Sequence, residues 1–448
     1  MAPIMSRIAI IGAGVSGIAT AKQLAHHNPV VFEASDSIGG VWSHCSYRST
    51  KLQSPRCDYE FSDFPWPDRD NSSFPSHLEI LDYLRSYAKH FDVLKYVRFN
   101  SKVAALRYLG NGEPPANGRS PGEYGSLLAG QPVWEVAVQT NGSETIQVVI
   151  FTLTNMHDFL LLRLGFEFVV VCIGKYGDIP IIPEFPEEKG PEIFEGKVLH
   201  SLDYCKLDHD ASTHLLKDKK KLVVSKFIES YLLHKLPLEK YGLKPDHPFV
   251  EDYASCQMAI MPENFFPEAD KGKIVFKRSS KWWFWKKGIE FEDKTKIETD
   301  VVVLATGYDG KKKLKAIMPE PFRSLLEYPS GVIPLYRSTI HPLIPNMAFV
   351  GYVESVANLH SSELRSIWLA RLVDDKFKLP GVVEMLERTQ KEVEVMKRTT
   401  RFYKRNCIST YSINHSDEIC EEMGWTSWRK KSWLSEAFSP YTSQDYLN

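Results

Sequence analysis

The stretch that decides the fold runs from residue 7 to residue 33 and reads RIAIIGAGVSGIATAKQLAHHNPVVFE. A short apolar strand leads into Gly12-Ala13-Gly14-Val15-Ser16-Gly17, a GxGxxG motif. A helix is predicted over 16–27 and a second strand over 29–33, which ends in Glu33. The motif alone is a weak signal in a chain with 26 glycines. Its flanking strand, helix and acid, however, are the context that a dinucleotide-binding βαβ unit requires.

Each glycine of the motif has a physical task in such a unit. Gly12 allows the tight turn, Gly14 lets the backbone approach a pyrophosphate, and Gly17 allows close packing of helix on strand. The amino end of the following helix points N–H groups at the phosphate charge. Glu33 can accept hydrogen bonds from ribose hydroxyls and would repel a 2′-phosphate, which favours FAD or NAD over NADP at this site.

Two more glycines and an aromatic residue follow the second strand, in the segment Ser37-Ile38-Gly39-Gly40-Val41-Trp42. Glycines here suit a close approach of the backbone to the flavin end of a bound FAD. For Trp42 alone, ordinary core packing is an equally good interpretation. Together with the GxGxxG unit, this segment predicts FAD as the cofactor.

The overall composition excludes several classes of protein. With 43% hydrophobic and 25% charged residues, the 448-residue chain has ordinary globular usage, enough for two or three domains. Its 55 Lys+Arg balance 56 Asp+Glu, so no net field favours nucleic acid or anionic lipid. Seven widely spaced cysteines without a CxxC pair predict reduced thiols. No signal peptide or sorting motif is recognisable, which predicts an intracellular, cytoplasmic protein.

Further elements are predicted from periodicity along the chain. Helices are predicted over 80–90, 362–372 and 380–397. Strands are predicted over 131–140 and 166–173, a strand is expected to start at 219–224, and a buried parallel-type strand is predicted over 300–306. The apolar run over 148–164 carries four polar or charged residues, so a strand leading into a short amphipathic helix is expected rather than a membrane span.

Several ordered segments resemble one known family, the flavin-containing monooxygenases, and most closely its plant clade that includes N-hydroxylases of immune signalling. The segments are GAGVSG (12–17), FEASDSIGGVW (32–42), FSDFP (61–65), FPSHLEILDYLRSYAKHF (74–91), VVVCIGKYGDIPIIP (169–183), FEGKVLHSLDY (194–204) and LATGYDG (304–310). The sixth is similar to the family's identifying pattern F-x-G-x-x-x-H-x-x-x-Y, with Phe194, Gly196, His200 and Tyr204. The resemblance spans almost the whole chain except about 148–165 and a break near 224.

The resemblance implies an α/β flavoprotein with two dinucleotide-binding domains. NADPH would reduce FAD, O₂ would form a C4a-hydroperoxyflavin, and one oxygen would pass to a nucleophilic nitrogen or sulfur of a small-molecule substrate. In such an enzyme the flavin carries the hard chemistry, while the protein orients it and excludes water. Neither a catalytic triad nor a metal site is therefore expected.

The resemblance also implies which residues meet the cofactor. Contacts with FAD are implied for Gly12, Ala13, Gly14, Val15, Ser16, Gly17, Glu33, Gly40, Val41 and Trp42, and Val103 would meet the adenine through its backbone. Many relatives have an Asn near the flavin shortly before FSDFP, and the corresponding position here is Gln53. Gln keeps the amide on a longer arm, so Gln53 is the one candidate for a catalytic role, with a plain loop residue as the alternative.

The chain departs from the family pattern after the strand predicted at Lys221–Val224. The family has a second GxGxx[GA] there, for NADPH, whereas this chain reads Ser225-Lys226-Phe227-Ile228-Glu229-Ser230 without a glycine. About 80 residues separate this strand from that at 300–306, too few for a complete NADPH domain and its second half. An internal deletion or a mis-spliced gene model is the expected cause.

These observations predict three parts. Residues 1–190 would be the first part of the FAD-binding Rossmann domain, 191–310 a truncated NADPH-binding domain, and 311–448 the remainder of the FAD domain with a helical C-terminal region. The predicted function is NADPH-dependent oxygenation of nitrogen or sulfur. The alternatives are an inactive FAD-binding remnant and an amine oxidase that uses FAD alone, although the latter leaves FSDFP and FEGKVLHSLDY unexplained.

Two smaller signals have ordinary interpretations. The basic and aromatic stretch Lys281–Lys287 (KWWFWKK) resembles a membrane-interface or single-strand nucleic-acid patch, but near-zero net charge favours packing. His26 and His27 end a predicted helix, where they are expected to favour the helix dipole rather than to bind a metal.

Overall fold

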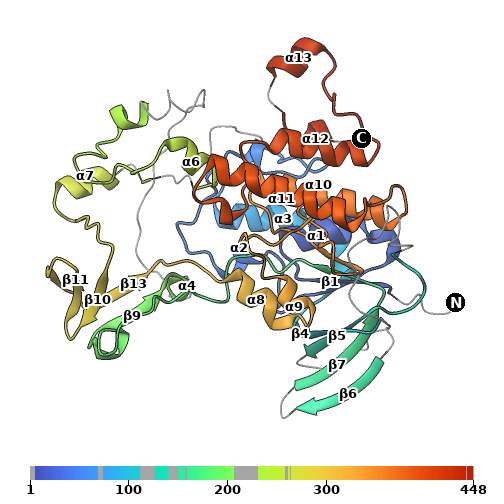
Figure 1. The fold of residues 1–448 in the computed structure, drawn as a ribbon, viewed down its shortest axis with the longest axis horizontal. Helices are drawn as coiled ribbons and strands as arrows, with labels where there is room; N and C mark the ends of the chain where they lie inside the picture. The colour runs from blue at the N-terminus through green and yellow to red at the C-terminus, as the bar shows by residue number, and fades with distance from the viewer. Residues whose placement is uncertain are drawn as a thin grey trace.

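The computed structural model describes residues 6–68, 74–110, 127–140, 150–156, 159–205, 231–257, 261–262, 264–439 and 441–446. Figure 1 shows a helical layer over a central sheet, with a strand-rich extension on one side and a strand hairpin below. The strand start predicted at 219–224 lies outside the described residues.

A five-stranded parallel sheet, here called the first sheet, forms the centre of the molecule. Its order is β14-β8-β1-β2-β3. Its strands are β1 (Ile8–Ile11), β2 (Val30–Phe32), β3 (Val97–Arg98), β8 (Phe168–Val171) and β14 (Met347–Phe349). Every residue of β1, β2, β8 and β14 is buried, as expected for apolar parallel strands that are covered on both faces.

Two helices far apart in the sequence pack together against this sheet. They are α1 (Val15–Gln23) and α10 (Asn358–Val373). Their interface uses small hydroxyl residues, because Thr20 Oγ1 lies 3.0 Å from Ser366 Oγ and Ser16 Oγ lies 3.1 Å from Ser362 Oγ. Short side chains at these positions let the two helices approach closely. The contact places α10, from a distant part of the chain, beside the GxGxxG motif.

The remaining described helices differ in how they begin. The helix α3 (His77–His90) starts with a capping box between Ser76 and Glu79. The others are α2 (Val41–His44), α4 (Ser201–Tyr204), α6 (Phe249–Ala254), α7 (Phe265–Asp270), α8 (Gly310–Ile317), α9 (Phe322–Leu325), α11 (Val382–Thr399), α12 (Ser412–Glu422) and α13 (Trp433–Phe438). In the described parts of the chain, no helix is both long and apolar enough to cross a membrane.

The apolar run at 148–164 corrects one prediction. It forms two antiparallel strands, β6 (Ile150–Met156) and β7 (Phe159–Phe166), rather than a strand and a helix. They extend β4 (Ser101–Tyr108) and β5 (Trp134–Thr140) into a sheet of order β4-β5-β7-β6. In β7, Leu162 and Leu164 are buried, whereas Arg163 between them binds Glu135 of β5 at 2.8 Å. Each of the two strands has only seven or eight residues, a length at which an apolar run fits a strand or a buried helix equally.

The second sheet is a parallel pair of β9 (Lys197–His200) and β13 (Val301–Leu304). The prediction that residues 300–306 form a parallel strand is confirmed, but the prediction that this strand is buried is wrong. Val301 and Val303 are 48% and 47% exposed. Nearby, β10 (Trp282–Trp285), β11 (Gly288–Phe291) and β12 (Lys296–Glu298) form an antiparallel sheet.

The cysteines correct a further prediction. Cys256 and Cys407 form a disulfide across 151 residues of sequence, and the other five cysteines remain thiols. The two residues meet because the segment that includes α6 lies against residues 400–409: Ser409 Oγ donates to the Tyr253 carbonyl, and Thr400 Oγ1 to that of Glu251 at 3.1 Å. Spacing along the chain contains no sign of this contact.

Candidate cofactor-binding site

The GxGxxG loop joins β1 to α1 with almost no spare room. Gly12 has φ +98°, and a Cβ there would lie 2.8 Å from the Cys172 carbonyl oxygen of β8's extension. A Cβ on Gly17 would lie 1.9 Å from the Gly12 carbonyl oxygen. Both positions therefore require glycine for packing within the protein itself.

Gly14 and Gly40 face each other across the amino end of α1. A Cβ on Gly40 would lie 3.2 Å from the Cα of Gly14, and Gly40 itself has φ +56°. The Gly39 N–H donates to the Ala13 carbonyl at 3.1 Å, which fixes the second glycine segment over the first. Gly14 is the N-cap of α1 and offers no side chain to the first N–H groups of the helix. The helix end thus presents donors and a partial positive charge beside a backbone surface without side chains.

Glu33 lies at the end of β2 with its carboxylate against this loop. Its side chain is buried, Oε2 accepts from the Ala13 N–H at 2.7 Å, and Oε1 accepts from the N–H and hydroxyl of Ser35 at 2.9 and 2.7 Å. The Glu33 carbonyl accepts from the Ser101 N–H at 2.8 Å, so β4 starts directly behind it. A carboxylate in this place can accept hydrogen bonds from the ribose hydroxyls of a nucleotide on the loop.

Val103 lies two residues further along β4. Its side chain is buried and it pairs with Val138 of β5, and the register shifts between Val103 and Ala105. Such a bulge leaves backbone groups outside the ladder. Its place beside the Glu33 end of the loop suits a backbone contact with an adenine.

Val41 and Trp42 begin α2 on the opposite side of the loop. Val41 is exposed, whereas the Trp42 indole is half-buried and donates to the Tyr59 hydroxyl at 2.9 Å. Burial raises the pKa of Tyr59, so this hydroxyl stays protonated at neutral pH.

The FSDFP segment after Tyr59 is tied to three helices. The Phe61 N–H donates to Tyr83 of α3 at 2.7 Å, and the Ser62 N–H donates to Glu363 of α10 at 2.8 Å. Lys22 of α1 pairs with Asp63 at 2.6 Å. The motif is therefore a structural junction that holds α1, α3 and α10 around the loop.

Gln53 lies in the turn before this junction. The turn is fixed by its neighbours, since the Leu52 N–H donates to the Pro75 carbonyl at 2.8 Å, while the Gln53 side chain is exposed. Its catalytic role stays a prediction.

The two later motifs, FEGKVLHSLDY and LATGYDG, meet each other at the second sheet. His200 caps α4 by accepting from the Leu202 N–H at 3.1 Å, and its ring lies 5.4 Å from that of Tyr308, edge to face. Gly196 lies where a Cβ would be 2.4 Å from the Asp300 carbonyl. His200 Nε2 is buried and has no partner among the described residues. These motif residues therefore join β9 to β13.

One charged cluster near the first sheet was missed by sequence reasoning. Lys175 follows β8 and Glu354 follows β14, and their side chains pair at 2.7 Å, with Arg405 3.0 Å from the other carboxylate oxygen. Burial lowers the pKa of Lys175, which Glu354 partly offsets. Parallel strands present their carboxyl ends at one edge, where ligands of such sheets bind. The signal was a charged residue four positions after the end of β8 and another five positions after the end of β14.

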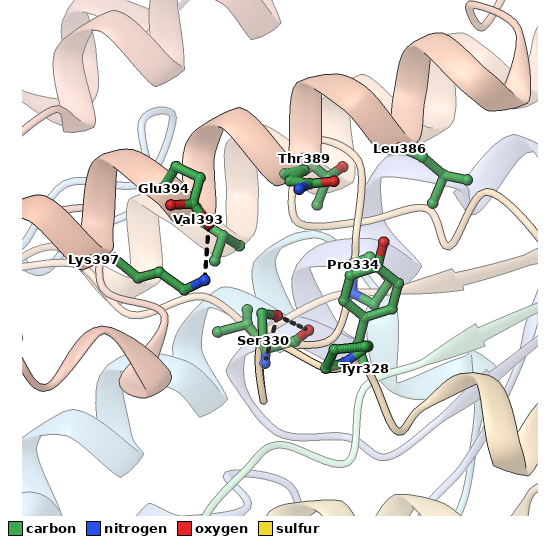
Figure 2. A pocket seen from close by; sticks show the side chains of 11 residues that line it. Tyr328, Ser330, Pro334, Leu386, Thr389, Val393, Glu394 and Lys397 are labelled. Atoms are coloured by element: carbon green, nitrogen blue, oxygen red, sulfur yellow. Dashed lines mark hydrogen bonds and ion pairs between the residues drawn. The ribbon is translucent and has the colours of Figure 1, made fainter.

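A cavity of about 320 Å³ lies elsewhere, between α11 and residues 328–334. Figure 2 shows Leu386, Thr389, Val393, Glu394 and Lys397 on the helix facing Tyr328, Ser330 and Pro334. Glu394 and Lys397 pair with each other at 2.8 Å. None of the predicted site residues lines it.

The geometry of the GxGxxG loop and its surroundings defines the class of protein. A parallel sheet, a GxGxxG turn into a helix, a facing Gly40 and a buried acid at the end of the second strand together form a dinucleotide-binding flavoprotein site, and the residues present fit FAD.

Comparison with known proteins narrows this class to a family. The protein-family model described as flavin-binding monooxygenase-like matches residues 5–112 and 209–428 of this chain. The Arabidopsis thaliana protein named "Probable flavin-containing monooxygenase 1" is 56% identical over an alignment of 524 residues, which covers 98% of this chain and 96% of the relative. This chain belongs to the flavin-containing monooxygenase family and is a flavin-dependent monooxygenase.

Solved structures agree on the fold. An S-allyl-L-cysteine S-oxygenase from Allium sativum superimposes with a TM-score of 0.58 at 19% identity, covering 98% of this chain and 95% of that one. The monooxygenase OTEMO, in complex with FAD and NADP, gives 0.60 at 16% identity, covering 90% and 92%. These are two-dinucleotide-domain flavoproteins, so the predicted fold class is confirmed.

Proposed function

We propose that this chain oxygenates a nucleophilic nitrogen or sulfur of a small molecule, with FAD as cofactor, NADPH as reductant and O₂ as the second substrate. The observation that carries the proposal is the Gly14–Gly40 surface beside the buried Glu33 carboxylate, in a chain 56% identical to a plant flavin-containing monooxygenase. FAD, when bound, supplies the redox chemistry with NADPH and O₂. The sulfur chemistry in the name of the Allium structure agrees with this substrate class.

The residues of the chain would bind and orient the cofactor. The first N–H groups of α1, with Gly12, Ala13, Gly14, Val15, Ser16 and Gly17, would hold the pyrophosphate, and Glu33 would accept from the ribose. Val103 would contact the adenine through its backbone, and Gly40, Val41 and Trp42 would line the flavin side. Each carboxylate oxygen can accept more than one hydrogen bond, so Glu33 can accept from a ribose hydroxyl while Oε2 keeps its bond from the Ala13 N–H.

The proposal includes an incomplete NADPH site within residues 191–310, between the FAD-binding parts at 1–190 and 311–448. Residues 225–230 contain no glycine where the family has its second GxGxx[GA]. The 524-residue alignment with the Arabidopsis relative also exceeds the 448 residues of this chain, so at least 76 aligned positions have no counterpart here. The exposed Val301 and Val303 agree with a sheet that lacks part of its usual cover.

The decisive experiment is an anaerobic absorbance spectrum of the FAD-loaded protein before and after NADPH is added. We expect the oxidised flavin band to bleach slowly or not at all, because the loop for the NADPH pyrophosphate is incomplete. Rapid bleaching would disprove the incomplete NADPH site. Dithionite provides the control, since it reduces bound flavin without a nucleotide site, and protein without a flavin band would contradict FAD binding itself.

The role of Gln53 is proposed with its own test. If its amide acts near the flavin, Gln53→Ala should slow product formation per reduced flavin while FAD content is unchanged, and Gln53→Asn should retain more activity than Gln53→Ala. Equal activity in both variants and the wild type would make Gln53 an ordinary turn residue.

The cytoplasm remains the proposed location, and the Cys256–Cys407 disulfide weighs against it, because disulfides are rare in reducing compartments. Counting the free thiols of protein taken directly from cells tests both the proposed location and the disulfide.

A further inference from the structure

A second cluster of ligand-type side chains lies away from the cofactor loop, at the far end of α1. His26 and His27 form the 3₁₀ turn η1 (Ala25–His27) after this helix, and Asp374 is the C-cap of α10. His26 Nε2 and His27 Nε2 lie 2.8 and 2.7 Å from one and the same oxygen, Asp374 Oδ1. All three ligand atoms lie within 4.8 Å of one another.

The three side chains are held by packed elements. The helices that carry them, α1 and α10, are joined through Ser16–Ser362 and Thr20–Ser366. The turn itself is fixed from the other side, because the Tyr96 hydroxyl donates to the Ala25 carbonyl at 3.1 Å. The donors therefore converge from two helices whose relative position is already set.

The charge at this place favours a cation. Asp374 lies at the carboxyl end of α10, where the helix dipole is negative and an acidic side chain is unfavourable unless a positive charge is near. Its neighbour Asp375 is paired with Lys378 at 2.6 Å, whereas the Asp374 carboxylate lies against the two imidazoles.

We propose that His26, His27 and Asp374 bind Zn²⁺ or a similar late first-row divalent ion. Two imidazole nitrogens and one carboxylate oxygen are ligands that zinc prefers, with water in the remaining position. Ligand atoms bound at about 2 Å in a tetrahedron lie about 3.3 Å apart, so each histidine nitrogen needs to move only about 0.5 Å further from Asp374 Oδ1. Each histidine then holds its proton on Nδ1. His26 is half exposed, which gives the ion access from solvent.

Such an ion would tie the end of α1 to the end of α10. Because it binds the folded chain and not the separated segments, it stabilises the fold by mass action. This effect is independent of whether FAD or NADPH is bound.

The test is equilibrium dialysis of the FAD-loaded protein against Zn²⁺ alone, after treatment with a chelator, together with thermal unfolding. The wild type should bind one Zn²⁺ that the double variant His26→Ala/His27→Ala does not, and its Tm should rise with Zn²⁺. Asp374→Asn should weaken binding at least tenfold. His247→Ala is the matched control, since His247 lies 3.0 Å from Asp246 and 2.8 Å from Asp252 but outside this cluster, and it should bind Zn²⁺ like the wild type.

The comparison with the double variant removes the contribution of the thiols, because both proteins contain the same cysteines. FAD absorbance reports folding in every variant and does not depend on the metal, so a failed cofactor proposal would be seen separately. Equal Zn²⁺ binding by the wild type and the double variant, or no binding by either, would overturn the metal site.

Discussion

The first and second sheets both contain short, valine-rich parallel strands, yet their surroundings differ. Every residue of β8 is buried, whereas in β13 Val301 and Val303 are about half exposed. The sequence of a strand sets its pairing and its pleat, but burial depends on what covers it. The difference teaches that similar apolar strands can be fully buried in one sheet and half exposed in another, according to what packs on them.

The surroundings of acidic side chains also differ between the part of the molecule around the first sheet, here called the first region, and residues 191–310, here called the second region. In the first region Glu363 is buried and its pKa is raised to about 7, chiefly by burial and also by Asp63. In the second region Asp293 is exposed and Glu268 is half-buried, and hydrogen bonds from lysines lower the pKa of each to about 2. The Glu363 carboxyl is thus shielded from water, whereas solvent reaches the carboxylates of Glu268 and Asp293.

The largest expected effect comes from a methyl group in the cofactor loop. Gly17→Ala places a Cβ 1.9 Å from a backbone carbonyl, so the loop or the helix must move. We expect a loss of about 4 kcal/mol in the free energy of unfolding and more than a tenfold loss of bound FAD. The flavin-to-protein absorbance ratio measures this. Gly272→Ala in the second region, where no atom lies within 4 Å, should cost about 1 kcal/mol and keep FAD.

The next largest effect tests the disulfide between Cys256 and Cys407, which links the second region to the C-terminal part of the chain. Cys256→Ser removes the disulfide and should lower the free energy of unfolding by about 3 kcal/mol, because the unfolded chain gains freedom. Urea unfolding followed by tryptophan fluorescence measures it, and reduced wild type should behave like the variant. Seven reactive thiols in denatured, unreduced protein would contradict the link.

A somewhat smaller effect concerns pH. Because the folded pKa of Glu363 lies above its usual value of 4.5, the folded state holds the proton more tightly, and this contribution to stability is complete below pH 4.5 and lost as pH rises through 7. Wild type should lose about 2–3 kcal/mol more than Glu363→Gln between pH 5 and 8. Glu298→Gln, on the exposed β12, should follow the wild type. Parallel curves for Glu363→Gln and wild type would show that the carboxyl is hydrated.

The smallest effect compares the strands directly. Val170→Thr buries a hydroxyl in the first sheet and should cost about 2 kcal/mol, whereas Val303→Thr in β13 should cost less than about 0.5 kcal/mol. Denaturant midpoints at equal m-values provide the measurement. A cost at Val303 equal to that at Val170 would mean that β13 is covered in solution.

The first sheet could be predicted from the sequence because its signals are local. The strand, GxGxxG turn, helix and Glu33 lie within 27 residues, and the structure has them as expected. The hairpin of β6 and β7 was missed because apolar runs of this length fit either kind of element. The exposure of Val303 depends on neighbours from elsewhere in the chain, which no strand pattern contains.

The charged cluster and the disulfide were missed for one reason. Tyr176 and Glu354, which share a hydrogen bond, lie 178 residues apart, and the two bonded cysteines lie 151 residues apart. Such pairs are created by the order of strands in the sheet and by the docking of one segment on another. Motif residues such as His200 were found, although their shared place beside Tyr308 was not.

The disulfide also determines the covalent topology of the chain. It closes residues 256 to 407 into a ring that contains β10 to β14 and α7 to α11. A single cut by a protease anywhere inside this ring leaves one molecule of unchanged mass apart from an added water. Only reduction releases two fragments, so gels run with and without reductant will give different apparent sizes for the same nicked protein.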